Sequence, residues 1–194
     1  MTTNNEQDGT SNQTETRAFT FNPSVATFNV PKQTYLTTYP QPPNTLIATG
    51  ALVLIPPKPH ILLLQRSRTD TMPNLWEVPG GACDDSDPTI LHGAARELFE
   101  ETGLRVQHFV ALVGEPQVFT TGSGKRICKF LFLVEVEDER KGGMGKVRLD
   151  EREHQAFVWA SEGEVREGRV GEVLLRFTSR EMEEVVLGCF RADC

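Results

Sequence analysis

The stretch that decides the fold is "VPGGACDDSDPTILHGAARELFEETGL", residues 78–104. Its first part is rich in turn-forming residues, and its second part has the apolar spacing of an amphipathic helix. Asp87 followed by Pro88 predicts a helix start with Asp87 as the side-chain cap, and Gly103 predicts the helix end. We therefore expect a helix over about 88–102.

Three glutamates crowd one face of this expected helix. Glu97, Glu100 and Glu101 lie three or four positions apart or side by side, so they share a face and repel one another unless a positive charge offsets them. Hard divalent cations such as Mg²⁺ prefer carboxylate oxygens. Two interpretations follow, namely a metal site or a solvated acidic face with Arg96 as its partner.

The quoted stretch resembles the Nudix box, the signature of hydrolases that act on nucleoside diphosphates linked to another moiety. The second half of that pattern is matched without exception from Arg96 to Leu104, and Gly81 fits its opening glycine. Gly81 lies fifteen positions before Arg96, where the strict pattern has fourteen, and the glutamate of the first half is missing. Counting from Gly81 makes Asp87 the substitute, whereas counting back from Arg96 gives Pro88. We expect one extra residue in this loop.

The resemblance implies an α/β fold, the Nudix-type α/β/α sandwich with a mixed β-sheet in a single domain. The rest of the chain has a matching pattern, because short runs rich in β-branched and aromatic residues alternate with Gly- and Pro-rich turns. The expected strands are 46–55, 60–66, 106–113, 116–121, 126–137 and 155–160. Capping boxes are expected at Ser161 with Glu164, before a short helix, and at Thr178 with Glu181, before a last helix over about 179–190.

The N-terminal part has a different composition. Residues 1–18 are rich in Thr, Asn and Gln, so we expect them to be disordered. Residues 19–44 contain isolated aromatic residues and five prolines, which predict an extended arm packed on the domain. We therefore divide the chain into an N-terminal tail, residues 1–44, and a Nudix domain, residues 45–194.

The resemblance also implies a chemistry, in which water attacks a phosphorus of a diphosphate bridge with the help of Mg²⁺ or Mn²⁺. Arg96 would hold a glutamate by a charge-assisted hydrogen bond, so that Arg96 and Glu100 count among the catalytic residues. The implied metal ligands are Gly81, through its carbonyl oxygen, and Glu97, Glu100 and Glu101.

Residues outside the box complete the expected site. Glu153 lies just before an expected strand, where many Nudix relatives carry a catalytic glutamate, and Glu151 is the neighbouring candidate for the general base. Arg66 and Arg68 follow the second expected strand and are candidates for binding substrate phosphates.

Charge and composition limit the partners. The net charge of −7 argues against general nucleic-acid binding, which usually needs a basic face. No apolar run is long enough for a transmembrane helix, and the first residues contain no apolar signal core. The four cysteines show no zinc-like spacing and are interpreted as reduced thiols, so we expect a cytoplasmic protein without membrane contact, with a homodimer left open.

Two functions from different classes follow. The first is a metal-dependent hydrolase that cleaves a diphosphate linkage in a nucleoside diphosphate derivative or a related pyrophosphate. The second is a Nudix-like module that binds a nucleotide or a protein without cleaving it, which the altered first half of the box suggests.

Overall fold

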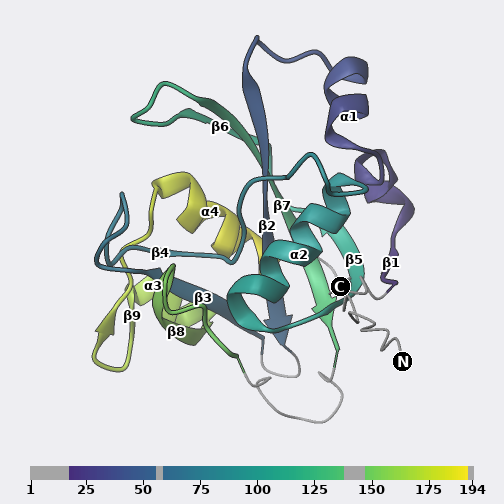
Figure 1. Ribbon diagram of the computed structural model, residues 1–194. Helices are drawn as coiled ribbons and strands as arrows, with labels where there is room; N and C mark the ends of the chain where they lie inside the picture. The colour runs from purple at the N-terminus through teal and green to yellow at the C-terminus, as the bar shows by residue number, and fades with distance from the viewer. Residues whose placement is uncertain (1–17, 56–58, 138–146, 192–194) are drawn as a thin grey trace, which may run out of the picture.

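The computed structural model describes residues 18–55, 59–137 and 147–191 (Figure 1). The expected disordered tail, residues 1–18, lies outside the described residues except for its last position, so its disorder stays a prediction.

A mixed β-sheet forms the middle of the molecule, with the strand order β1-β5-β7-β2-β3-β4. Two further strands extend it, since β6 pairs with β7 and β8 pairs with β3. The strands along the sheet are β1 (Thr20–Phe21), β5 (Val106–Leu112), β7 (Arg126–Val136), β2 (Thr45–Ile55), β3 (His60–Arg66) and β4 (Trp76–Glu77), with β6 (Gln117–Thr120) and β8 (His154–Ser161) beside them. β2 and β7 run parallel, from the pair Thr45–Arg126 to the pair Val53–Val134, whereas β3 lies antiparallel to β2.

Two helices cover the two faces of this sheet, because β2 and β7 are apolar on both faces. Helix α2 (Ile90–Thr102) lies in front of β2 in Figure 1, and its Leu98 belongs to the same buried cluster as Ala51 of β2. Helix α4 (Arg180–Cys189) contributes to a second cluster, which holds Leu52 of β2. The alternating residues of β2 therefore separate two cores, and the predicted α/β/α sandwich with a mixed sheet is confirmed.

The bounds of helix α2 differ from the prediction at the N-terminal end. Its cap is Thr89, whose side chain accepts a hydrogen bond from the His92 N–H, and its end at Gly103 has φ 72° as predicted. The prediction that Asp87 caps the helix is wrong. Its carboxylate instead accepts hydrogen bonds from the Asp84 N–H and from Arg96, so it is no longer available to the first turn of the helix.

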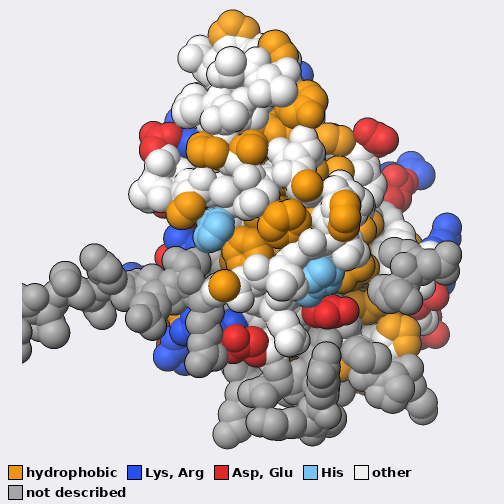
Figure 2. Space-filling view, turned by 90° about the vertical axis from the view of Figure 1, so that its right-hand side faces the viewer, with side chains coloured by type: hydrophobic (Ala, Val, Ile, Leu, Met, Phe, Trp, Pro, Cys, Tyr) orange, Lys and Arg blue, Asp and Glu red, His pale blue; other side chains and the backbone are white. Residues whose placement is uncertain are grey.

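The sequence predicts an extended arm over residues 19–44, but the segment is partly helical. It contains β1, a 3₁₀ helix η1 (Pro23–Phe28) and a helix α1 (Lys32–Thr38). Val25, Phe28 and Tyr35 are buried, and the Phe28 ring lies 4.8 Å from the ring of Phe130 between centroids. Pro23 is the first residue of η1, and the fixed φ angle of proline suits the first position of a helix. This explains why a helical turn forms where the prolines predict an extended chain. The face that carries these elements shows scattered apolar side chains and few charged ones (Figure 2).

The remaining elements follow the predicted order. The capping box of Ser161 and Glu164 is present at α3 (Glu162–Glu167). Helix α4 is capped by Ser179 rather than by Thr178, because the Ser179 side chain accepts the hydrogen bond from the Met182 N–H. Two-residue strands were not predicted, since they are too short to show an alternating pattern. These are β1, β4 and the hairpin of β9 (Arg169–Val170) and β10 (Val173–Leu174).

The described residues contain no helix that is long and apolar enough to cross a lipid bilayer. Cys83, Cys128 and Cys189 are buried free thiols, and burial raises the pKa of the Cys83 thiol to about 12. Cys83 is therefore a poor nucleophile at neutral pH.

Candidate metal centre

The glycine loop of the box is held along the free edge of strand β2. The Thr49 N–H donates to the Gly81 carbonyl at 2.8 Å, and the Ala51 N–H donates to the Pro79 carbonyl at 2.8 Å. Since a carbonyl oxygen has two lone pairs, the Gly81 oxygen keeps one for a ligand. The loop is thus placed by sheet-like hydrogen bonds rather than by its own turn alone.

The glycine backbone of this loop contacts the glutamate side chains of helix α2. The Gly80 N–H donates to Glu101 Oε2 at 2.7 Å. A Cβ atom added to Gly81 would lie 2.6 Å from Glu97 Oε2, closer than real Cβ contacts. Glycine at position 81 is therefore required for the close approach of Glu97, whose side chain reaches the loop from α2.

The three glutamates of the box differ in exposure. The exposed side-chain fraction is 6% for Glu101, 14% for Glu97 and 55% for Glu100. Burial raises the pKa of Glu101 well above its usual range, although the Gly80 N–H acts in the opposite direction, and burial also raises the pKa of Glu97. The interpretation of a solvated acidic face is therefore wrong for Glu101. Two desolvated carboxylates lie where an oxygen-binding cation would neutralise them.

Arg96 joins the loop to the helix. Its guanidinium donates to Asp87 Oδ1 at 2.9 Å and Oδ2 at 3.0 Å, to Glu97 at 2.9 Å and to Glu100 at 2.9 Å. It also donates to the Ala82 carbonyl at 3.0 Å. Asp84 lies 3.6 Å from the same guanidinium, so one positive charge is shared among four carboxylates, and it forms no ion pair with Glu101. Arg96 therefore positions the acids without neutralising them all.

A second charged group lies behind the loop. Arg66 forms ion pairs with Glu77 and, at 2.6 Å, with Asp70. Burial alone would raise the pKa of Glu77, but His154, Lys129 and Arg66 together hold it below the usual range. Glu77 is therefore ionised, and the charge of Arg66 is already used by two acids. The sequence did not single out Glu77, although it lies in "WEVPGG" beside the box.

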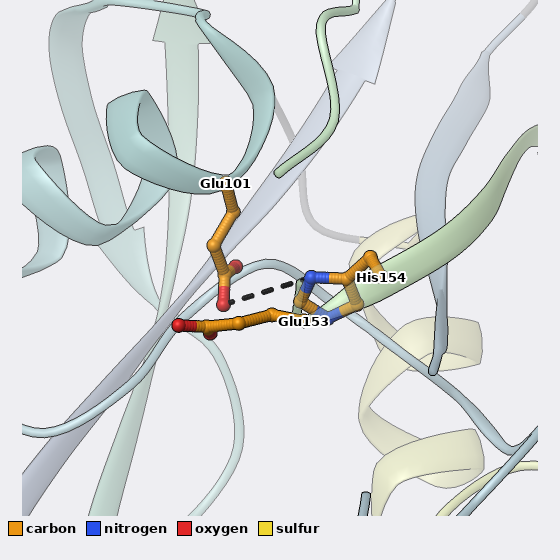
Figure 3. Close-up of side chains that lie close together, drawn as sticks. All are labelled: Glu101, Glu153 and His154. Carbon is orange, nitrogen blue, oxygen red and sulfur yellow. Dashed lines mark ion pairs between the residues drawn. The ribbon is translucent and has the colours of Figure 1, made fainter. Parts of the chain in front are cut away.

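Two further residues, Glu153 and His154, lie at the start of β8 and point toward Glu101 (Figure 3). One ligand atom from each of Glu101, Glu153 and His154 lies within 4.8 Å of the other two, which is close enough for a shared metal ion. His154 is 3% exposed, its Nδ1 lies 4.0 Å from Glu101 Oε1, and this nitrogen has no hydrogen-bond partner in the described part of the chain. From the sequence alone, a loop histidine is the preferred interpretation of His154 and a metal ligand is the alternative. An unpartnered buried imidazole nitrogen fits a cation site, and its neighbour Glu153 was the only sequence signal for it.

These groups line one cavity of about 330 Å³. Its lining residues are Arg66, Asp70, Gly80, Gly81, Ala82, Glu97, Glu101, Glu153 and His154. The structure thus brings together four sequence-predicted groups and the newly found His154, with Arg66 in the wall; the four are Gly81, Glu97, Glu101 and Glu153. The predicted residues Arg96 and Glu100 do not line this cavity. Arg68 and Glu151 are exposed and do not belong to this lining.

A second cavity of about 460 Å³ opens beside the first. The segment that forms its outer wall is held on the end of α2, since the Arg148 N–H donates to the Thr102 carbonyl at 2.8 Å and the Asp150 N–H to the Glu101 carbonyl at 3.3 Å. No sequence motif indicated this cavity. Its lining residues are Glu97, Phe99, Glu100, Glu101, Arg148, Asp150, Arg152 and Glu153.

Comparison with known families decides the identity of this arrangement. The model of the NUDIX domain family matches residues 45–180. This chain belongs to the NUDIX family. The predicted Nudix membership is thereby confirmed.

Individual Nudix proteins are similar over shorter stretches. The m7GpppN-mRNA hydrolase NUDT17 of Xenopus laevis is 33% identical over 108 residues, which are 51% of this chain and 36% of the relative. The RNA pyrophosphohydrolase of Rhizobium meliloti is 44% identical over 46 residues, 24% of this chain and 27% of the relative. The matches thus span about a third and about a quarter of these two relatives. A solved structure of a Caenorhabditis elegans Ap4A hydrolase binary complex has a TM-score of 0.57 and 20% identity, over 75% of this chain and 96% of that chain, which supports the fold.

Proposed function

We propose that this Nudix protein is a divalent-metal-dependent hydrolase that cleaves a diphosphate linkage in a nucleotide derivative. The observation that carries the proposal is the pair of desolvated carboxylates, Glu97 and Glu101, against the bare backbone of the glycine loop. Two buried carboxylates side by side lower the stability of the folded protein unless a cation is bound between them. A protein that only bound a partner at this site would not need these two buried charges.

Mg²⁺ or Mn²⁺ fits the donor set, which is dominated by carboxylate and carbonyl oxygens. Glu97, Glu100 and Glu101 would hold the ion, with the remaining lone pair of the Gly81 carbonyl oxygen as a further donor. When bound, a cation of this kind supplies positive charge against phosphate oxygens and makes a neighbouring water more acidic. Arg96 keeps Glu97 and Glu100 in place by charge-assisted hydrogen bonds.

Glu153 is our candidate for the general base. It borders both cavities, is exposed to solvent, and accepts no side-chain hydrogen bond from another described residue. A carboxylate with free lone pairs beside the bound phosphate can accept a proton from the attacking water. Glu151 is the weaker candidate, because it borders neither cavity.

The names of the relatives support the reaction class. An mRNA cap hydrolase and an RNA pyrophosphohydrolase both act, by name, on linkages of the phosphoric anhydride kind. We therefore propose a nucleotide-type diphosphate as substrate, with Arg66 as a wall residue of its cavity.

A substrate panel tests this proposal. Nucleoside triphosphates, nucleotide sugars, dinucleotides and coenzyme A are incubated with Mg²⁺ or Mn²⁺, and with a chelator as the metal-free reference, while phosphorus products are followed by chromatography. We expect metal-dependent cleavage of at least one class, and a loss of at least ~100-fold in Glu101→Gln, since removing a metal ligand costs several kcal/mol of transition-state stabilisation.

The matched control is Glu184→Gln, an acid on the exposed face of α4, which should keep wild-type turnover. Thermal stabilisation by several of these nucleotides without any product, in the presence of both metals, would overturn the hydrolase proposal. That result would support the binding module instead.

A further inference from the structure

The two cavities share a rim made of Glu97, Glu101 and Glu153. A diphosphate linkage held at this rim has two substituents, one on each side of the bond that breaks. Since the cavities open on either side of the rim, each would receive one substituent. Their different linings therefore bear on which substrates fit.

Among the described residues that line the first cavity, no unpaired arginine or lysine is available for an additional phosphate. Arg66, its lining arginine, is paired with both Glu77 and Asp70. An extra negative charge on the substituent in this cavity would lie near Glu97 and Glu101, and no unpaired arginine or lysine of the described lining would be available to bind it. This side of the rim favours an uncharged substituent.

The second cavity has two arginines in its wall. Arg152 is held by Asp150, with distances of 3.0 Å and 2.8 Å to its two carboxylate oxygens. Arg148 is exposed and forms no ion pair with any residue in the described ranges, while its backbone is fixed on α2 by the bond to Thr102. Arg148 is thus a cation of fixed backbone position, directed to a cavity that also holds the acids of the box.

We propose that Arg148, with Arg152 beside it, binds a phosphate of the substrate beyond the linkage that is cleaved. The inference rests on the proposed hydrolase function and narrows its substrate class to nucleotides with three or more consecutive phosphates. A guanidinium matches two phosphate oxygens at once, which makes arginine suited to this position. Without it, the third phosphate would be repelled by the acids of the same cavity.

A series of diadenosine di-, tri- and tetraphosphates tests the site, because the ends are constant and only the number of phosphates changes. We expect wild-type KM to fall from the diphosphate to the longer bridges, and Arg148→Gln to raise KM at least about tenfold for the longer bridges, with little change for the diphosphate. Arg148→Lys, which keeps the charge, should restore part of the loss. Arg180→Gln removes an equal charge from the exposed start of α4 and should leave all three values unchanged.

Binding of inorganic tripolyphosphate and pyrophosphate with Mg²⁺, measured by calorimetry, gives a readout that needs no turnover. Arg148→Gln should weaken tripolyphosphate binding about tenfold and pyrophosphate binding little. Equal effects on both anions, or none on either, would overturn the phosphate site. If the calorimetric difference is found but neither the diadenosine series nor any compound of the substrate panel is cleaved, the phosphate site is supported and the hydrolase proposal fails.

Discussion

The carboxylate of Glu101 accepts a hydrogen bond from the Gly80 N–H at 2.7 Å, which joins the last turn of α2 to the glycine loop. Glu101 is also the most buried acid of the box. One backbone donor satisfies part of its hydrogen-bonding capacity but not its charge. The stability of the metal-free protein should therefore respond to the ionisation of this group.

Glu101→Gln should stabilise the metal-free protein at neutral pH. Burial raises the pKa of Glu101 in the folded state. The folded protein therefore keeps its full stability below the unfolded pKa of about 4.3, where Glu101 is protonated in both states. This stability is lost as pH rises through the folded pKa, because the buried carboxylate then becomes charged. The melting temperature of Glu101→Gln, measured in a chelator, should exceed that of wild type by a few degrees at about pH 8 and should approach it at about pH 4. With Mg²⁺ the order should reverse, since only wild type gains from binding. A difference that does not depend on pH would contradict this account, and the exposed Glu100→Gln is the comparison variant.

Two neighbouring glycines should respond differently to alanine. A Cβ at Gly80 would lie 2.2 Å from the Thr49 carbonyl oxygen, at φ +150°, so backbone must move, and Gly80→Ala should cost about 3 kcal/mol or more. At Gly81 the obstacle is the movable Glu97 carboxylate, so Gly81→Ala should keep most of its stability but lose the Mg²⁺-dependent rise in melting temperature. Gly163→Ala, with no atom within 4 Å of the new Cβ, should change neither quantity. Similar melting temperatures for Gly80→Ala and Gly163→Ala would refute the loop geometry.

Asp87→Asn should weaken the link between loop and helix. Asp87 is 7% exposed at its side chain and accepts two hydrogen bonds from Arg96, so the change should cost about 1.5–3 kcal/mol. Displacing Arg96 should also raise the Mg²⁺ concentration needed for half-maximal activity, because Arg96 holds Glu97 and Glu100. Asp85→Asn is the matched control, since Asp85 is 83% exposed and contacts Lys32 instead. Denaturant titrations and metal titrations of both variants check the prediction, and indistinguishable results would refute it.

Truncation should separate two parts of the N-terminal region. Deleting residues 1–17 removes almost no apolar side chains, so the melting temperature should stay within a few degrees of the full chain. Deleting residues 1–44 also removes Val25, Phe28 and Tyr35 from the core, and Phe28 alone is worth about 3–5 kcal/mol when truncated. Thermal melts followed by circular dichroism should show a drop of more than about 10 °C for the longer deletion. A large drop already in the shorter one would refute the boundary at residue 18.

The sequence was most informative where one local pattern carried the signal. The helix with Glu97, Glu100 and Glu101, its end at Gly103, and the long strands β2 and β7 all follow from periodicity or turn chemistry within a few residues. Local rules were less reliable where two neighbouring residues compete. Asp87 and Thr89 both suit a helix cap, and the choice depends on Arg96, which lies nine positions away from Asp87 and occupies its carboxylate.

The parts of the site that were missed depend on contacts between distant segments. His154 became a buried neighbour of Glu101 only because β8 pairs with β3 beside the glycine loop. Arg148 reaches the second cavity because its backbone bonds to Thr102 across a long stretch of chain. Neither arrangement leaves a short-range pattern, since the residues that recognise each other are far apart in sequence.

The docking of the glycine loop on β2 explains how this Nudix box accommodates its extra residue. The ladder along β2 extends to Cys83, whose N–H donates to the Ile47 carbonyl, and the helix begins at Ile90. Between them the backbone makes a local turn, with the Asp87 N–H donating to the Asp84 carbonyl. The box thus consists of two halves, the loop paired with β2 and helix α2, and the turn between them takes up the extra residue while each half keeps its own hydrogen bonds. A sequence search that requires a fixed number of residues between the loop and the helix would therefore miss proteins in which a longer turn leaves the two halves in the same relative position.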